Sequence, residues 1–219
     1  MRGLLPRLSS LIYENCCNIC GGLAGKSLVC KKCESSFRKR EASLLKEFPE
    51  IKVLSIWFYE EKIKNGILAL KSGNKKLAEY FGLQLAESSR NSLREFFASE
   101  NYSILPIPSH PRRIKERGFC HIKELARFLA TNISMPYSEE VIFRTKETFY
   151  MNSLVSASDR KKNIKGAFTV IASEVNKNIL LVDDILTSGS TMCELARTIL
   201  DSFPHVNLLG LTIASGDKY

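Results

Sequence analysis

Several features are missing from this 219-residue sequence, and each absence excludes a class of protein. No apolar run approaches the roughly 20 residues that a membrane-spanning helix needs, so we expect no membrane insertion. The first residues include Arg2 and Arg7 but only scattered apolar side chains, which does not match a secretory signal peptide. The expected location is therefore cytoplasmic. Gly25-Lys26-Ser27 is present, but the residue five positions before Gly25 is Cys20, so the full Walker pattern Gly-x-x-x-x-Gly-Lys-Ser/Thr is absent and a Walker-type nucleotide loop is excluded. The sequence also has no internal repeat.

The cysteines do not indicate a disulfide framework, because thiols stay reduced in the cytoplasm. Five of the seven cysteines lie before residue 34, which favours a metal site instead. Four of them have the spacing C-x2-C-x9-C-x2-C, namely Cys17, Cys20, Cys30 and Cys33. Four thiolates complete the tetrahedral shell of Zn²⁺, so we predict a structural zinc with no open position for catalysis. Cys16 is an alternative to Cys17, and a redox-active C-x-x-C pair is the alternative to a metal.

Positive charge exceeds negative charge in this chain. Lys and Arg number 32 against 23 Asp and Glu, a net charge of +9, and the excess is concentrated at residues 26–40, 112–123 and 144–165. This distribution favours a polyanionic partner such as pyrophosphate or nucleic acid. For any single cluster, a solvated basic surface is an equally good explanation. Trp57, Phe58 and Tyr59 could stack on bases, although aromatic residues are more often part of a core.

Residues 179–191, ILLVDDILTSGST, carry the strongest functional signal. The apolar run at 179–182 predicts a buried strand, followed at its carboxyl end by Asp183 and Asp184. A hydroxyl- and glycine-rich turn then leads into the helical pattern of residues 192–200. Backbone N–H groups and the positive helix end can hold a phosphate, and the acids can accept ribose hydroxyls or hold hydrated Mg²⁺. An ordinary strand-to-helix turn explains a hydroxyl or two, but not this whole run.

The remaining pattern predicts strands alternating with helices, and therefore a parallel sheet with right-handed crossovers. Strands are expected at residues 53–59, 104–108, 141–145, 166–171 and 206–214. Helices are expected at residues 63–71, 77–97 and 118–132, with a basic loop at 109–117 and a polar connection at 149–164. Lys71 could contact a phosphate, but a solvated helix end is the preferred interpretation. Ligands bind at the carboxyl ends of such strands, where three basic or phosphate-suited loops should meet.

The run at 179–191 resembles the phosphoribosyl pyrophosphate signature of type I phosphoribosyltransferases at every position. Together with the cysteine spacing, Pro106-Ile-Pro108 and Arg117-Gly118-Phe119, the sequence is similar to the ComF family, the ComFC-type proteins of bacterial natural transformation. The resemblance extends from Cys17 to about Ala214. The family's Arg-Gly-Phe-Asn-Gln is Arg-Gly-Phe-Cys-His here, and its Gln after the loop Thr is Met151.

The resemblance implies a type I phosphoribosyltransferase-like parallel sheet flanked by helices, with an N-terminal zinc-binding segment and a small N-terminal α+β hood. The expected division is a zinc-knuckle segment at 1–45, a helical hood region at 46–100 and a phosphoribosyltransferase-like core at 101–219. Asp183 and Asp184 would be the catalytic acids. The expected phosphoribosyl pyrophosphate ligands are these two acids with Thr187, Ser188, Gly189, Ser190, Thr191, Arg112, Arg113, Arg144 and Lys146.

The function implied is competence for natural transformation, in which the protein handles imported single-stranded DNA and binds phosphoribosyl pyrophosphate with Mg²⁺. Partners would then include single-stranded DNA and other competence proteins, such as DNA-processing or helicase components. Whether a Mg²⁺-dependent transferase reaction occurs stays open, and so does its acceptor. The alternative is a housekeeping phosphoribosyltransferase of nucleobase or amine metabolism with no DNA role.

Overall fold

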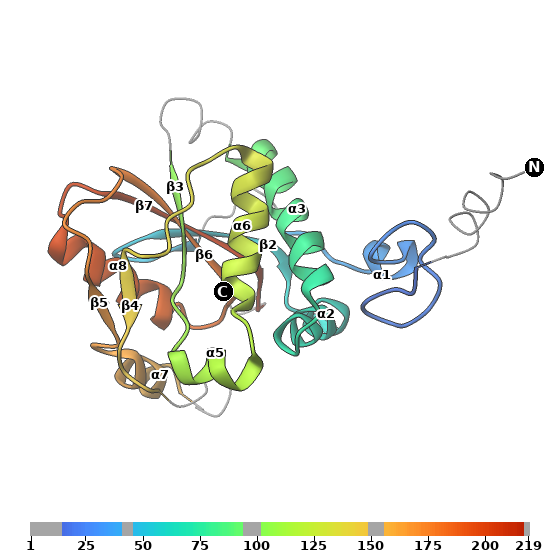
Figure 1. Ribbon diagram of the computed structural model, residues 1–219, viewed down its shortest axis with the longest axis horizontal. Helices are drawn as coiled ribbons and strands as arrows, with labels where there is room; N and C mark the ends of the chain where they lie inside the picture. The colour runs from blue at the N-terminus through green and yellow to red at the C-terminus, as the bar shows by residue number, and fades with distance from the viewer. Residues whose placement is uncertain (1–14, 41–45, 94–101, 149–155, 217–219) are drawn as a thin grey trace, which may run out of the picture.

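The structure is a computed structural model that describes residues 15–40, 46–93, 102–148 and 156–216 (Figure 1). Its centre is a five-stranded sheet in the order β1-β2-β7-β6-β3. The strands are β1 (Lys46–Glu47), β2 (Lys52–Phe58), β3 (Ser103–Pro106), β6 (Asn178–Leu186) and β7 (Asn207–Ser215). β2, β7, β6 and β3 are parallel, and only β1 is antiparallel to its neighbour. The predicted parallel sheet is confirmed, whereas the strands expected at 141–145 and 166–171 form a separate antiparallel pair.

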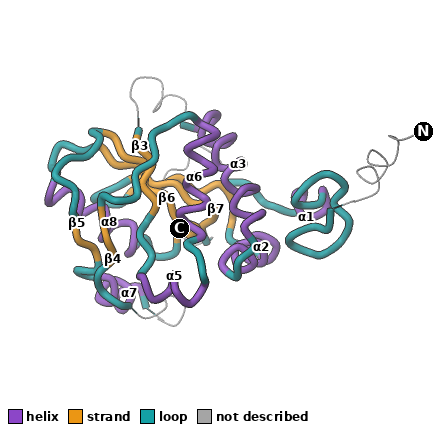
Figure 2. The backbone as a smooth tube through the Cα atoms, viewed as in Figure 1, coloured by secondary structure: helices purple, strands orange, loops and turns teal. Residues whose placement is uncertain are grey.

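Helices cover both faces of this sheet, as Figure 2 shows. One face packs against α2 (Glu61–Lys71), α3 (Lys75–Ser92) and α6 (His121–Ile133). The other face packs against α8 (Ser190–Ser202), α7 (Ala157–Ile164) and a two-stranded ribbon of β4 (Ile142–Arg144) and β5 (Phe168–Val170). Two clusters of buried apolar side chains, one on each face, form the core. None of the described helices is long and apolar enough to cross a membrane.

The predicted hood region contributes directly to the main sheet. β2 pairs with β7 over most of its length, from Lys52 opposite Leu209 to Phe58 opposite Ser215. α3 follows the prediction of a helix at 77–97 as far as Ser92, and residues 94–97 lie outside the described residues. The division of the chain into three parts stays a prediction.

β6 is longer than its apolar run, which corrects the position predicted for the acids. The pairing with β7 continues through Asp183 opposite Thr212 to Leu186 opposite Ser215. On the other side β3 stops at Pro106 opposite Val182. The acids therefore lie within β6, on a segment that extends beyond the end of β3. The strand continues because β7 supplies hydrogen-bonding partners to the backbone of polar residues as readily as to that of apolar ones.

Two segments predicted as loops are helical. Residues 109–117 include helix α5 (Pro111–Arg117), which has a proline in its first turn and ends at Gly118 with φ of 74°. These are the usual signals for the start and end of a helix. Part of the polar connection at 149–164 forms α7, whose first turn is capped by the Ser156 hydroxyl accepting from the Asp159 N–H at 3.0 Å. α7 has no repeating apolar face, so periodicity did not indicate it. Residues 149–155 lie outside the described residues.

The cysteine-rich segment, which includes α1 (Lys31–Ser35), lies at the end of the molecule beyond α2 and α3 (Figure 1). The Tyr80 hydroxyl of α3 donates to Glu34 at 2.9 Å, and the rings of Phe37 and Trp57 are 5.8 Å apart. Trp57 is only 1% exposed, so it belongs to the core and cannot stack on bases. Phe58 and Tyr59 are half-buried.

Candidate functional site

The two acids of β6 have different surroundings. Asp184 is buried, and its Oδ2 accepts hydrogen bonds from two side chains on one face of the sheet. His121 Nε2, at the start of α6, lies 2.7 Å away, and Lys71 Nζ, at the end of α2, lies 2.9 Å away. Asp183 accepts the N–H of Asp184 at 2.8 Å through its Oδ1. Asp184 is thus held by donors from two helices.

This asymmetry separates the two carboxyl groups electrostatically. Burial opposes the ionisation of Asp184, but Lys71 and His121 outweigh it and hold its pKa well below its ordinary value. Burial and the neighbouring Asp184 charge instead raise the pKa of Asp183 to about 7. Burial also acts against the charge on Lys71, yet Asp184 raises the pKa of this ammonium. At neutral pH the pair therefore combines one firmly ionised acid with one that can exchange a proton.

Lys71 and His121 were not among the predicted site residues. The preferred interpretation of Lys71 as a solvated helix end is wrong, since its side chain is only 28% exposed and pairs with Asp184. The available signal was that Lys71 ends a helix just before the turn at Gly73. His121 appeared in the sequence only as a departure from the family pattern, and nothing in the sequence placed it beside β6.

The predicted phosphate loop connects β6 to α8. Gly189 has φ of 74°, a left-handed conformation that favours glycine, and an added Cβ would lie 2.4 Å from the Phe48 ring. The Ser188 and Ser190 hydroxyls are 2.8 Å apart, and the Ser190 N–H at the start of α8 donates to the Ser188 hydroxyl at 3.4 Å. The N-cap residue itself, Gly189, makes no side-chain cap. A small pocket here is lined by Asp183, Ile185, Leu186, Thr187, Gly189, Ser190, Thr191 and Met192. The loop and Asp183 therefore share one hollow at a helix N-terminus, whose N–H groups and hydroxyls are suited to an anion.

Of the four predicted basic ligands, two lie together near Asp183 and two pair with other residues. Arg144 lies in β4 and is buried, and burial together with nearby Arg113 lowers its pKa to about 10. Arg144 hydrogen-bonds to the Thr148 hydroxyl, and its Nε has no partner among the described residues. The negative charge of Asp183 acts in the opposite direction to burial and favours the charged form of Arg144. Arg113 donates to the Thr148 carbonyl at 2.9 Å. Arg113 and Arg144 thus form a basic wall near Asp183.

Arg112 and Lys146 are engaged elsewhere. Arg112 is exposed and pairs with Glu116 at 3.0 Å and Glu147 at 2.6 Å. Lys146 Nζ donates to the Lys165 carbonyl at 3.1 Å. None of these partners is one of the acids or a residue of the β6–α8 loop, and the role of both residues in ligand binding stays a prediction.

The four predicted metal ligands come together. The Sγ atoms of Cys17, Cys20, Cys30 and Cys33 all lie within 4.8 Å of one another. Burial acts against ionisation of Cys17, but backbone N–H groups, including that of Cys30 at 3.3 Å, lower its pKa to about 6. Cys16 is exposed and outside this group. The cluster could hold a tetrahedral metal ion, and the donor set fits one that prefers thiolates.

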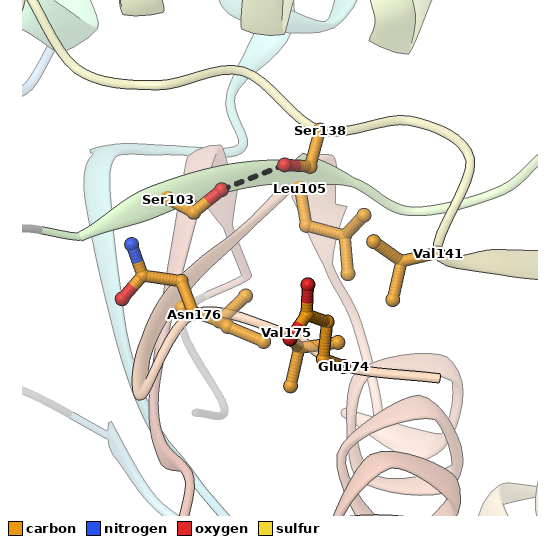
Figure 3. Close-up of a pocket in the computed structure, with 8 residues that line it drawn as sticks. Ser103, Leu105, Ser138, Val141, Glu174, Val175 and Asn176 are labelled. Carbon is orange, nitrogen blue, oxygen red and sulfur yellow. Dashed lines mark hydrogen bonds between the residues drawn. The ribbon is translucent and has the colours of Figure 1, made fainter. Parts of the chain in front are cut away.

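A larger pocket, of about 350 Å³, lies at the other edge of the sheet. Figure 3 shows its wall at the beginning of β3, where the Ser103 and Ser138 hydroxyls are 2.9 Å apart. Glu174, Val175 and Asn176 line its other side. This pocket is at the amino ends of the strands and is separate from the acids and the loop, which lie at the carboxyl ends.

The fold and the site define a class: an α/β protein with an acid pair and an anion-suited loop at one sheet edge, and a separate four-cysteine cluster. No family model matches the chain. It is 31% identical over 100 residues to "Competence protein F" of Haemophilus influenzae, covering 44% of this chain and 43% of that protein. It is 33% identical over 97 residues to "DNA utilization protein YhgH" of Escherichia coli K12, covering 44% and 42%. These matches span less than half of each relative.

A longer match connects the chain to "Competence protein ComFC" of Bacillus subtilis, with 24% identity over 209 residues, 92% of this chain and 78% of that protein. The chain is thus similar to proteins named for competence and for DNA utilization. Among solved structures, a hypoxanthine phosphoribosyltransferase from Staphylococcus aureus has a TM-score of 0.39 at 14% identity, covering 64% and 66% of the two chains. An adenine phosphoribosyltransferase from Leishmania tarentolae has 0.36 at 13%, covering 80% and 95%. Likenesses this weak carry no functional argument.

Proposed function

We propose that this protein is a competence protein that binds phosphoribosyl pyrophosphate at the β6–α8 edge and handles single-stranded DNA during natural transformation. The supporting observation is the single hollow that is lined both by Asp183 and by Gly189 and the start of α8. A ribose phosphate needs acceptors for its hydroxyls and a cradle for its phosphate within one site. The relatives named for competence and DNA utilization support the biological context.

Each group has a distinct role in this proposal. The N–H groups at the start of α8 and the hydroxyls of the loop would bind the 5′-phosphate, and Asp183 would accept ribose hydroxyls. Arg113 and Arg144 would neutralise the pyrophosphate, because two adjacent guanidiniums that already repel each other gain most from an anion between them. Mg²⁺, when bound with the ligand, would neutralise further phosphate charge. If transfer occurs, this fixed positive charge would stabilise the departing pyrophosphate.

The four-cysteine cluster has a structural role in this proposal. Zn²⁺ held by Cys17, Cys20, Cys30 and Cys33 would have a complete shell, with no position for a substrate. It would hold the basic segment at residues 31–40 against α3 and β2, so that this segment can contact nucleic acid. The protein would act in the cytoplasm, where imported single strands are processed.

Calorimetric titration with phosphoribosyl pyrophosphate and Mg²⁺ tests the ligand. Asp183→Asn should weaken binding at least about tenfold, since hydrogen bonds to a charged group contribute about 1.5–3 kcal/mol. Asp201→Asn is the matched control, because Asp201 is an exposed acid at the far end of α8. Equal affinity of both variants would place the ligand elsewhere.

The housekeeping alternative makes different predictions. A housekeeping transferase should release pyrophosphate when supplied with a nucleobase or amine, and its deletion should impair growth on that compound. The proposed protein should instead be dispensable for growth and required for transformation. Complementation of the deletion with Asp183→Asn, at matched protein levels, should fail to restore transformation. Full restoration would make the ribose-phosphate site irrelevant to competence.

A further inference from the structure

A line of polar contacts extends from the acid pair to the helix that carries Arg113. Arg117, the last residue of α5, places its Nη1 3.3 Å from His121 Nδ1. His121 Nε2 lies 2.7 Å from Asp184 Oδ2, and the Asp184 N–H is donated to Asp183. His121 is only 4% exposed, so its two ring nitrogens have these two protein partners rather than bulk water.

The chemistry of these partners assigns the proton on the ring. A guanidinium has only donors, so His121 Nδ1 must be the acceptor of the Arg117 contact. A neutral imidazole that accepts at Nδ1 carries its hydrogen on Nε2. That hydrogen points to Asp184, an ionised carboxylate. The Nε2–H tautomer therefore satisfies all three groups, whereas the Nδ1–H tautomer would place two donors face to face at Arg117.

Charge compensation alone does not require His121, because Lys71 already pairs with the same Asp184 oxygen at 2.9 Å. Two donors on one oxygen from different helices restrict the rotation of the carboxylate more than either donor alone. α5 is also tied through Arg117 to the acid-bearing strand. Arg113, which forms the basic wall with Arg144, lies on the same helix one turn earlier.

We infer that His121, as the neutral Nε2–H tautomer, is a positioning residue that orients Asp184 and docks α5, with Arg113, against the ribose-phosphate site. The binding test rests on the proposed function, but the assignment of the tautomer does not. The role is to hold other groups in place, and His121 itself does not contact the ligand.

The binding test uses substitutions that separate hydrogen bonding from packing. In His121→Leu the side chain keeps an apolar bulk but has neither donor nor acceptor, and it should weaken phosphoribosyl pyrophosphate binding at least about tenfold while the thermal unfolding midpoint is kept. In His121→Gln an amide N–H can donate to Asp184 and a carbonyl can accept from Arg117, so this variant should restore affinity to within about threefold of wild type. Binding by His121→Gln as weak as that by His121→Leu, or wild-type affinity in His121→Leu, would overturn the inference.

A spectroscopic test does not depend on any ligand. The chain has three histidines, so ¹⁵N spectra of the imidazole rings can be assigned with His110→Gln and His205→Gln. At neutral pH, His121 should show a protonated Nε2 and an unprotonated Nδ1. Arg117→Ala should shift this pattern towards a mixture of tautomers, whereas Lys115→Ala, an exposed cation on the same helix, should not. An Nδ1–H ring or a doubly protonated ring would overturn the inference.

The two tests fail in distinguishable ways. If wild-type protein binds no phosphoribosyl pyrophosphate, the proposed function is wrong, and the ¹⁵N spectra still decide the tautomer and its dependence on Arg117. If the ligand binds but His121→Leu and His121→Gln behave alike, the proposed function stands and the positioning role is wrong.

Discussion

At the scale of single residues, the acid pair shows how two identical side chains acquire different properties. Asp184 is ionised because Lys71 and His121 converge on one of its oxygens. Asp183, which has the charge of Asp184 beside it, has its pKa raised from 3.8 to about 7. Adjacent positions on a strand point to opposite faces, so neighbours in sequence have different partners in space. A site that needs one fixed and one exchangeable acid can be built from two aspartates in this way.

The raised pKa of Asp183 predicts a pH dependence of ligand binding. Below about pH 7 Asp183 is protonated and accepts ribose hydroxyls or cations less well, so affinity for phosphoribosyl pyrophosphate with Mg²⁺ should rise between about pH 6 and about pH 8. The second ionisation of the ligand's phosphate, which has a pKa of about 6, adds to this rise in affinity in every variant. Calorimetry on wild type and Asp183→Asn separates the contribution of Asp183 from that of the phosphate. In the variant, only the ionisation of the ligand's phosphate should still change the affinity with pH. Parallel profiles would show that Asp183 does not titrate in this range.

The same shift predicts the sign of a stability change. Between about pH 4 and about pH 7 the folded protein holds a proton that the unfolded chain has released, so the contribution of Asp183 to stability falls as the pH rises through this window. Asp183→Asn removes this contribution and should make the protein more stable than wild type at about pH 8, measured by urea unfolding. Asp184→Asn should do the opposite at the same pH, because it leaves Lys71 without its carboxylate partner. If Asp183→Asn is less stable than Asp184→Asn at this pH, the opposite pKa shifts are assigned to the wrong members of the pair.

At the scale of elements, the β6–α8 connection depends on one glycine for two separate reasons. Gly189 adopts a left-handed backbone conformation that favours glycine, and it also lies against the ring of Phe48, which precedes β2. The second requirement links the phosphate loop to the amino-terminal half of the chain. The loop is therefore shaped by packing from a distant segment as well as by its own composition.

Gly189→Ala tests this packing, and Gly118→Ala provides a matched control with the same φ of 74°. The control has no heavy atom within 4 Å of the added Cβ, so it should cost only the conformational penalty of about 1–2 kcal/mol. Gly189→Ala should cost more, because Phe48 must move, and it should abolish phosphoribosyl pyrophosphate binding. Urea unfolding and calorimetry on both variants measure the difference. Equal losses would show that Phe48 yields without consequence.

At the scale of the whole molecule, the described residues form a five-stranded sheet with helices on both faces, a separate two-stranded ribbon, and a cysteine segment at one end. The segment contributes few side chains to the core, notably Phe37, and its own apolar interior is small. Such a segment needs a cross-link to fold, and four thiolates within 4.8 Å provide one when a metal binds. The segment and the acid pair are joined through α2 and α3.

Metal removal should therefore unfold the segment. Purified protein should contain about one zinc per chain, and Cys20→Ser should release it and cause aggregation or loss of the thermal transition. Cys16→Ser should retain both the metal and the transition, because Cys16 lies outside the cluster. Elemental analysis and calorimetric scanning of the three proteins decide this. A well-folded wild type without metal would contradict it.

Single-stranded DNA should bind in a salt-dependent way through the basic residues near the cluster. Lys31→Gln with Lys32→Gln should weaken binding and reduce the slope of log affinity against log salt by up to about 0.7 for each phosphate that is no longer neutralised. Lys161→Gln with Lys162→Gln is the matched control, since it also removes two exposed lysines from a short helix, α7, at the other end of the molecule (Figure 1). Fluorescence anisotropy at several salt concentrations measures both. Equal effects, or affinity independent of salt, would refute this surface.

Features that depend on local pattern were predictable from the order of the amino acids. The four cysteines, the run at 179–191 and the alternation of strands and helices are all contiguous or closely spaced, so the cysteine cluster, the β6–α8 loop and the parallel sheet could be predicted. α5 could also have been predicted from its proline and glycine. α7 could not, because its sequence, ASDRKKNI, has too few apolar residues to show a period.

Only the tertiary structure determined which side chains contact one another across the sheet, because these contacts join segments that are distant in sequence. Lys71, His121 and Asp184 are separated by 50 and 63 residues in sequence, and no periodicity relates them. They meet because α2 and α6 pack on the same face of β6 and end or begin at its carboxyl edge. The order of the strands also places β2 beside β7 and leaves the acids on a segment that β3 does not cover. Long-range packing, which a linear pattern does not encode, thus determined the electrostatics of the site.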